Sequence, residues 1–211
     1  MSTGLEGYIT IGGRMDVEQV IKKSRFLCAL MPVASPDEAK AELDAIKKKH
    51  YNASHNCSAV VTGDDRASDD GEPQGTAGMP MLEALKKSGL TYVQAVVTRY
   101  FGGTLLGAGG LSRAYGGAVA DAVAKAEKVR VVPADVYRFA VDYADYGKLQ
   151  SVAAEFGAVL TADFAEKVTA EGAIKKADAR RFEKRMTQAF MGADVYTVGG
   201  HCQLREKMDQ N

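Results

Sequence analysis

Residues 92–127 read YVQAVVTRYFGGTLLGAGGLSRAYGGAVADAVAKAE, and this stretch decides the fold of the first half of the chain. Its opening segment is short, apolar and rich in valine, which is typical of a central strand. A glycine-dense turn follows at 102–110, and apolar residues then recur at helical spacing over 111–127. Gly116 and Gly117 each destabilise a helix by roughly 1 kcal/mol relative to alanine. We therefore expect a strand, a turn and a helix, in which either a neighbour packs very close to these glycines or the helix is broken.

Upstream of this unit, apolar spacing and turn residues predict two strands, a helix, a third strand, a loop and a second helix. The first helix has a complete start signal, because Ser35 can cap it, Pro36 suits its first position and Glu38 completes a capping box. In chain order the predicted elements are a strand near 8–11 or 17–21, a strand within 22–33, the capped helix, a strand at 57–62, a loop at 63–78 and a helix opened by Pro80.

The pattern changes after Pro133, where we place a boundary between a domain of residues 1–132 and a domain of residues 133–211. Beyond it, strand-like and helix-like segments follow in the order β-α-β-β-α-β, which is the ferredoxin-like pattern. They are strands at 136–143, 159–164, 168–174 and 194–204, and helices that carry the apolar stripes 149–156 and 182–190. The sequence therefore predicts an α+β protein of two domains.

The composition limits the class of protein. Lysine plus arginine equals aspartate plus glutamate, 27 against 27, so the zero net charge argues against an unselective nucleic-acid coat protein but allows a local basic face. No apolar run approaches the roughly 20 residues that span a bilayer, and Met1–Ile11 lacks the pattern of a signal peptide. Cys28, Cys57 and Cys202 form no CxxC pair, which disfavours a zinc ribbon or a disulfide scaffold. We expect a cytoplasmic protein without a membrane contact, a metal or a cofactor.

Three stretches contain more glycine, charge and polar residues than a core requires. They are KKSRF at 22–26, HNC at 55–57 followed by SDDGEPQGTAG at 68–78, and RYFGGTLLGAGGLSRAYGG at 99–117. These blocks resemble the signature of the IMPACT family, in particular its bacterial YigZ-type members, and the likeness runs from Lys22 to Gly117. The downstream ferredoxin-like segment resembles the second domain that is usual in those members.

The resemblance implies a first domain with the β-α-β fold that is also found in domain four of elongation factor G, ribosomal proteins and GHMP kinases. It implies a second domain similar to domain five of the same factor. Eukaryotic members regulate translation by competing for the activator of a starvation-sensing stress kinase, and they carry an additional N-terminal partner-binding domain. We expect no room for that domain here and therefore no kinase-regulating role. The family supplies no settled catalytic residues.

The glycine-rich turn is a candidate anion site, because backbone N–H groups at the start of a helix attract phosphate. It is not a Walker motif, since Ala108 stands where lysine is required. The alternative interpretation is tight packing with turns that need positive φ. The candidate anion-binding residues are Arg25, Arg99, Gly102, Gly103, Gly107, Gly109, Gly110 and Arg113.

The acidic segment leaves three interpretations open. His55, Asp69, Asp70 and Glu72 are possible site residues that together hold a divalent cation. Alternatively, the acids bind their own backbone in a turn, or they pair with arginines of the other blocks and hold the loops together, which we favour. A nucleophilic pair of His55 and Cys57 is a weaker hypothesis, because buried cysteines are usually inert.

A predicted helix in the second domain has a further basic face, which either binds RNA phosphates or is simply the solvated side of an amphipathic helix. Its RNA-facing candidates are Lys176, Arg180 and Lys184, with Arg181 and Arg185 beside them. Single-stranded RNA also stacks on exposed aromatic rings. The candidates for stacking are Tyr100, Phe101 and Tyr115, of which we expect Phe101 to belong to the core.

These observations favour a non-catalytic, translation-linked protein that binds RNA or the ribosome through the glycine-rich, arginine-flanked surface. The alternative is an enzyme that acts on a phosphorylated or nucleotide-like substrate, with His55 and the acids supplying acid–base or metal chemistry. A third hypothesis, regulation through a protein partner, requires an exposed apolar patch. A closed pocket shared by His55, the acids and the turn favours the enzyme, whereas an open positive face favours RNA.

Overall fold

The computed structural model describes residues 7–208, which divide into two compact units. We call them the N-terminal unit, Tyr8–Arg130 with the end of the described chain from Lys207, and the C-terminal unit, Val131–Glu206 with Gly7. The division falls inside one strand, β7 (Lys128–Val141). The expected lack of a signal peptide concerns Met1–Ile11, of which residues 1–6 lie outside the described part.

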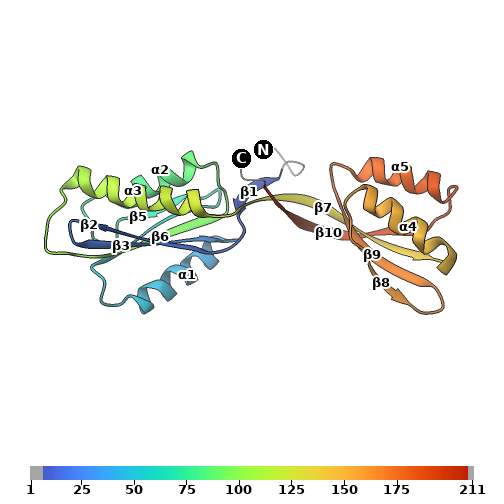
Figure 1. Ribbon diagram of the computed structural model, residues 1–211, viewed down its shortest axis with the longest axis horizontal. Coiled ribbons are helices and arrows are strands. Elements are labelled where there is room, and N and C mark those ends of the chain that lie inside the picture. Colours follow the sequence, from blue (N-terminus) through green and yellow to red (C-terminus); the bar gives the residue numbers. More distant parts are fainter. Residues whose placement is uncertain (1–6, 209–211) are drawn as a thin grey trace. The chain divides into compact units, whose positions relative to one another are not determined.

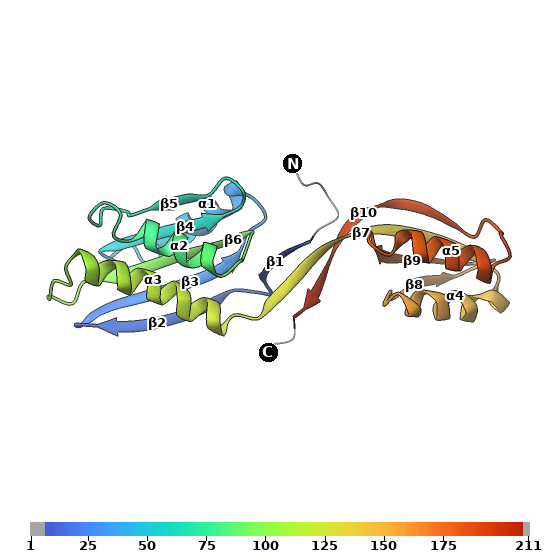
Figure 2. The same cartoon turned by 90° about the horizontal axis from the view of Figure 1, so that it is seen from above.

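The N-terminal unit is a sheet with helices on both faces (Figures 1 and 2). Its elements are β1 (Tyr8–Ile11), β2 (Met15–Ile21), β3 (Ser24–Pro32), α1 (Pro36–Lys49), β4 (His55–Val61), β5 (Arg66–Ser68), α2 (Gly78–Lys87), β6 (Val93–Tyr100) and α3 (Ala108–Lys125). The sheet has the order β2-β3-β6-β4-β5, and each neighbouring pair is antiparallel. The central strand β6 therefore separates β3 from β4, which α1 connects in sequence.

The predicted strand, turn and helix over 92–127 are confirmed. β6 is buried along nearly its whole length, and α3 runs without a break through Gly116 and Gly117. A Cβ on Gly116 would lie 3.4 Å from the carbonyl oxygen of Pro80 in α2, so the two helices approach closely at this point. A Cβ on Gly117 would meet no atom within 4 Å. The alternative of a broken helix is therefore wrong, and at Gly116 helix α2 lies at ordinary contact distance.

One prediction for this unit is wrong, because the segment 63–78 is not entirely a loop. Arg66–Ser68 forms the edge strand β5, which pairs with β4. All three of its residues are exposed, so the segment has no alternation of apolar and polar residues for a sequence pattern to detect. This strand forms because the backbone of residues 66–68 pairs with the edge of β4.

The two faces of the sheet form separate apolar layers. Helices α2 and α3 cover one face, where Phe26, Met81 and Tyr115 are fully buried. Helix α1 covers the other face through Ala39 and Ile46. This layering leaves the end of β6 and the start of α3 together at one end of the sheet, where the glycine-rich turn connects them.

The C-terminal unit has the element order β-α-β-β-α-β, as predicted. It consists of β7, α4 (Tyr143–Glu155), β8 (Thr161–Phe164), β9 (Val168–Lys175), α5 (Ala179–Ala189) and β10 (Tyr196–Lys207). β7, β9 and β8 lie in this order, both β10 and β1 pair with β7, and both helices lie on one face (Figure 1). The rings of Tyr137, Phe139 and Phe182 pack together in its core. No helix within residues 7–208 combines the length and hydropathy that crossing a membrane requires.

Candidate functional site

The three polar blocks of the sequence meet at one end of the N-terminal sheet. The register of β4 with β6 places His55 opposite Arg99. On the other side of β6, Phe26 of β3 also lies opposite Arg99. The acidic loop 69–77 leads into α2, and the glycine-rich turn 101–107 leads into α3. Arg99 is therefore flanked on the sheet by residues of both other blocks.

Asp69 holds the acidic loop in place. Its carboxylate accepts hydrogen bonds from the backbone N–H groups of Gly75 at 2.8 Å, Ala77 at 3.0 Å and Gly78 at 2.8 Å. Burial alone would raise the pKa of Asp69, but these three donors outweigh it and hold the pKa below its ordinary value. Asp69 thus fixes both the loop and the first turn of α2.

Asp70 connects the loop to β4 and α1. It has a positive φ of 44°, and its carboxylate accepts hydrogen bonds from the N–H of Asn56 and from Nζ of Lys47, each at 2.6 Å. Its backbone oxygen lies 2.9 Å from Nδ1 of His55. Asp69 and Asp70 are thus engaged in holding the loop, and neither lines the cavity described below.

We expect Asp69→Asn to lower the free energy of unfolding by about 1–2 kcal/mol at pH 7, because a neutral amide offers one acceptor oxygen to three donors. The pKa of Asp69 is lower in the folded protein than in the unfolded chain. The stabilisation by the carboxylate is therefore complete above the unfolded pKa of about 3.9, and it is lost as the pH falls through the lower folded pKa. Urea midpoints of wild type and variant should differ at pH 7 and converge in strong acid, and a pH-independent gap would contradict this account.

Glu72 is the centre of a buried polar network. Its Oε1 accepts hydrogen bonds from Nη1 of Arg99 at 2.5 Å and from the hydroxyl of Tyr115 at 2.7 Å. Glu72 is 7% exposed, Arg99 5% and Tyr115 fully buried. Burial, together with the interactions with Cys57 and Glu72, raises the pKa of Tyr115, so this tyrosine keeps its proton and donates a hydrogen bond to the carboxylate. One of the three predicted acids is therefore paired with an arginine of another block.

Two atoms of this network keep unused hydrogen-bonding capacity. Nε of Arg99 is buried and has no hydrogen-bond partner among residues 7–208. Oε2 of Glu72 lies 3.9 Å from Nε2 of His55, which is too long for a direct hydrogen bond. The Arg99 guanidinium also lies over the rings of Phe26 and Phe101, at 5.5 and 5.4 Å from their centroids.

The backbone of Asp70 orients His55. A carbonyl oxygen only accepts, so Nδ1 carries a proton in the hydrogen bond to Asp70, and Nε2 lies on the side of Glu72. Cys57 does not face His55 as a nucleophile, since its Sγ donates to the backbone oxygen of Asp69 at 3.0 Å. Burial raises the pKa of Cys57 to about 12, although its interaction with Tyr115 acts in the opposite direction. The thiol is therefore protonated and unreactive at neutral pH.

A cavity of about 410 Å³ opens above the network. Its polar wall contains His55, Glu72 and Arg99, and its far side contains Gly107 and Ala108 at the start of α3. Phe101, Leu105, Leu106 and Leu111 form an apolar wall, together with Gly71 and Pro73. The sequence interpretation missed this apolar wall, although two leucines within a turn are a signal, because a solvated turn requires none.

The start of α3 is uncapped. Gly107 precedes the helix with φ 74°, and no side chain among residues 7–208 caps the first turn, which also contains no acid. The N–H groups of Ala108, Gly109 and Gly110 therefore lack helical partners. Arg113 folds back toward them, since a Cβ on Gly109 would lie 3.5 Å from its Nη1. The predicted anion site thus has free donors and one exposed arginine.

The other two predicted arginines are already paired. Arg25 is exposed and lies 2.7 Å from Glu18, and Arg99 is buried against Glu72. Exposed cations are instead found at Lys22 and Lys23, the turn of the β2–β3 hairpin, which we call the lysine tip.

Gly102 joins the lysine tip to the glycine-rich turn. A Cβ on Gly102 would lie 2.0 Å from the carbonyl carbon of Lys23. The N–H of Gly102 donates to Oγ of Ser24 at 3.1 Å, so Gly102 has a structural role in holding the turn against the hairpin. Gly103, with φ 83°, provides the next bend of the turn.

The aromatic candidates are arranged differently from the expectation. Phe101 is 49% exposed, so the expectation that it belongs to the core is wrong. It follows the last residue of β6 and is therefore beyond the strand that buries its neighbours. Tyr115 is fully buried and unavailable for stacking. The hydroxyl of Tyr100 lies 2.9 Å from Nδ1 of His50.

The basic face on the C-terminal unit is present on α5. Arg180 and Lys184 are exposed on the helix, and exposed Lys176 lies in the turn that precedes it. Arg181 pairs with Asp178 at 3.0 Å, and Arg185 pairs with Glu155 at 2.8 Å. The two neighbouring arginines are thus paired with acids, whereas the three RNA-facing candidates form no ion pair within residues 7–208.

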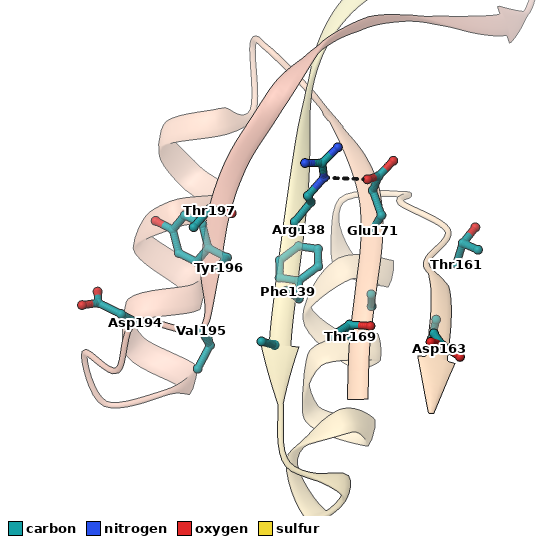
Figure 3. A pocket seen from close by; sticks show the side chains of 13 residues that line it. Arg138, Phe139, Thr161, Asp163, Thr169, Glu171, Asp194, Val195, Tyr196 and Thr197 are labelled. Carbon is teal, nitrogen blue, oxygen red and sulfur yellow. Dashed lines mark hydrogen bonds and ion pairs between the residues drawn. The ribbon is translucent and has the colours of Figure 1, made fainter. Parts of the chain in front are cut away.

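A larger cavity, of about 570 Å³, lies on the sheet of the C-terminal unit and contains none of the predicted site residues (Figure 3). Arg138 of β7 pairs with Glu171 of β9 at 3.0 Å across neighbouring strands. Asp163 and Asp194 also line the cavity. With its arginine paired and two further acids on its walls, this cavity does not suit a phosphate.

Comparison with known proteins gives the same two domains in the same order. The Impact N-terminal domain matches residues 22–123, and a domain of unknown function, DUF1949, matches residues 139–193. The chain is 42% identical over 196 residues to the IMPACT family member YvyE of Bacillus subtilis, covering 89% of each chain. It is 34% identical over 196 residues to the IMPACT family member YigZ of Escherichia coli, covering 90% of this chain and 96% of the relative.

A solved structure described as a hypothetical protein is similar over 99% of this chain and 100% of its own, with a TM-score of 0.63 and 29% identity. This similarity covers both units. Taken with identities of 34–42% over most of the chain, it agrees with the likeness of the three polar blocks. The chain belongs to the IMPACT family.

Proposed function

We propose that the protein binds RNA, free or on the ribosome, through a surface formed by the start of α3, the lysine tip and Phe101. The observation that carries the proposal is the uncapped, acid-free start of α3 with Arg113 beside it. Unpaired N–H groups and the positive end of the helix dipole favour a phosphate at this place.

The lysine tip and Phe101 supply the two other contacts that RNA requires. Lysines neutralise phosphates without reading the bases, and an exposed ring offers a stacking surface of about 1–3 kcal/mol for each base. Since the net charge of the chain is zero, such binding is local rather than a property of the whole surface. The exposed cations of α5 supply a second contact area.

A link to translation is part of the proposal. It is supported by the likeness of the first domain to domain four of elongation factor G that the resemblance to the IMPACT family implies. Fold likeness alone does not establish a function. The test must therefore include ribosomes as well as isolated RNA.

We expect wild-type protein to co-sediment with ribosomes at low salt and to dissociate at moderate salt, because counterion release dominates phosphate contacts. Lys22→Gln/Lys23→Gln and Phe101→Ala should each weaken this association about tenfold, which corresponds to about 1.4 kcal/mol. Association that is absent at low salt, or that both variants leave unchanged, contradicts the proposal.

The matched control is Lys48→Gln/Lys49→Gln. It removes the same charge from exposed positions at the end of α1, the helix on the other face of the sheet. This control should bind like the wild type. A parallel triple variant, Lys176→Gln/Arg180→Gln/Lys184→Gln, measures how much α5 and the turn before it contribute to the association.

An enzyme acting on a phosphorylated ligand is the second candidate function. One observation favours it: His55, Glu72 and the start of α3 line a single cavity, and the backbone oxygen of Asp70 fixes the orientation of His55. Phosphate release from nucleotides that is lost in His55→Gln would establish this activity. Nucleotide binding without turnover would exclude it for that ligand.

A further inference from the structure

The cavity beside the RNA-binding surface combines three kinds of wall. The start of α3, with Gly107 and Ala108, offers unpaired N–H donors. Phe101 is half exposed and Leu105 is 81% exposed, so both present apolar area. The polar wall contains Glu72, which is more than nine-tenths buried and still keeps Oε2 free beside Nε2 of His55.

These walls restrict the chemistry of an occupant. The helix start requires an anion, and the ring of Phe101 requires a flat, largely apolar group. Oε2 of Glu72 is an acceptor with no hydrogen bond among residues 7–208, so it requires a donor such as a hydroxyl from the occupant. Arg99 neutralises Glu72 through Oε1, so the carboxylate does not repel the anion as a free charge would.

The buried polar atoms are a second reason to expect a ligand. Nε of Arg99 is buried without a hydrogen-bond partner among residues 7–208, and Arg99 lines this cavity. Buried polar groups are seldom left unpaired, and the exceptions gather at functional sites. The cavity volume of about 410 Å³ falls within the range of roughly 300–1,000 Å³ that holds small ligands.

We propose that this cavity is a ribonucleotide subsite, in which the start of α3 binds the phosphate, Phe101 stacks on the base and Oε2 of Glu72 accepts a hydrogen bond from the ribose 2′-hydroxyl. The inference rests on the proposed function, and it names the part of the RNA that enters the protein. The 2′-hydroxyl is the group that distinguishes RNA from DNA, so the cavity selects ribose over deoxyribose.

The test compares ligands on unchanged wild-type protein by calorimetric titration. Adenosine 5′-monophosphate should bind about tenfold or more tightly than its 2′-deoxy form, because a hydrogen bond to a charged acceptor is worth about 1.5–3 kcal/mol. An RNA octamer should be preferred over the DNA octamer of the same sequence by a similar factor. The mononucleotide pair tests the binding of a free nucleotide, and the octamer pair tests the binding of a nucleotide within a chain.

Ala108→Asp blocks the phosphate without threatening the fold, because an acid in the first turn stabilises a helix. It should weaken nucleotide binding about tenfold. Ala120→Asp, at an exposed position farther along the same helix, is the control and should bind like the wild type.

The outcomes separate the inference from the proposed function. If RNA binds but ribose is not preferred over deoxyribose, or if Ala108→Asp does not weaken binding, the subsite is contradicted. RNA binding by the protein is then still supported. Ribose-selective binding of the mononucleotide without RNA binding supports the subsite and removes the RNA function. If neither ligand binds, both proposals fail.

Discussion

Arg99→Met is expected to lower the free energy of unfolding of the N-terminal unit by about 3–5 kcal/mol, because it leaves the Glu72 carboxylate buried without its counter-ion. The methionine occupies a similar volume, so the effect reports the lost charge rather than a cavity. Tyr115 still donates to Oε1 of Glu72, but a neutral hydroxyl does not replace a guanidinium. Hydrogen exchange of the β6 amides measures this unit in the intact chain.

Two further variants isolate the cause. The double variant Arg99→Met/Glu72→Gln removes both buried charges. Its loss of unfolding free energy should therefore be clearly smaller than that of Arg99→Met alone. Arg25→Met removes an arginine from the neighbouring strand whose partner is exposed Glu18, and it should change the stability little. Equal losses for Arg25→Met and Arg99→Met would show that burial of the pair is irrelevant.

Gly102→Ala is expected to destabilise the N-terminal unit by about 3 kcal/mol, near the upper end of the usual range for overpacking. The added Cβ would lie 2.0–2.3 Å from backbone atoms of Lys23 and Ser24, and backbone cannot rotate away as a flexible side chain can. The hairpin must move instead, and the lysine tip moves with it. We therefore expect weaker RNA binding as well as a lower urea midpoint.

Gly117→Ala is the matched control for this substitution. It adds the same methyl group to α3 at a place where no atom lies within 4 Å. Alanine is the better helix former by about 1 kcal/mol, so this variant should be more stable than the wild type. A loss of stability in both variants would mean that the contact with Lys23 does not explain the result at Gly102.

Much of the fold follows from local pattern. The strand at β6, the helix at α3, the cap at Ser35 and the βαββαβ order are all expressed in apolar spacing or turn chemistry within short segments. β5 was missed because three exposed residues have no period, and a free sheet edge determines their conformation. Strand order is likewise a property of the whole sheet.

The candidate site depends on pairings that sequence spacing leaves undetermined. Arg25, Arg99 and Arg113 are equivalent partners for the acids in the sequence, yet Arg99 alone of the three pairs with Glu72. That choice follows from β6 being the central strand, which buries Arg99 opposite His55. Phe101 was misplaced because its apolar character predicts burial, whereas its position just after β6 exposes it.

The place of β6 in the sheet has a consequence for synthesis of the chain. β3 and β4 both pair with β6 rather than with each other. Arg25 of β3, for example, lies opposite Tyr100 of β6. At roughly 5–20 residues per second, β3 emerges from the ribosome on the order of ten seconds before its partner. During that interval the nascent chain exposes two apolar strands with free edges. We therefore expect the N-terminal sheet to be completed only after β6 has emerged, and its ribosome-bound fragments that end before β6 to be the form most dependent on chaperones.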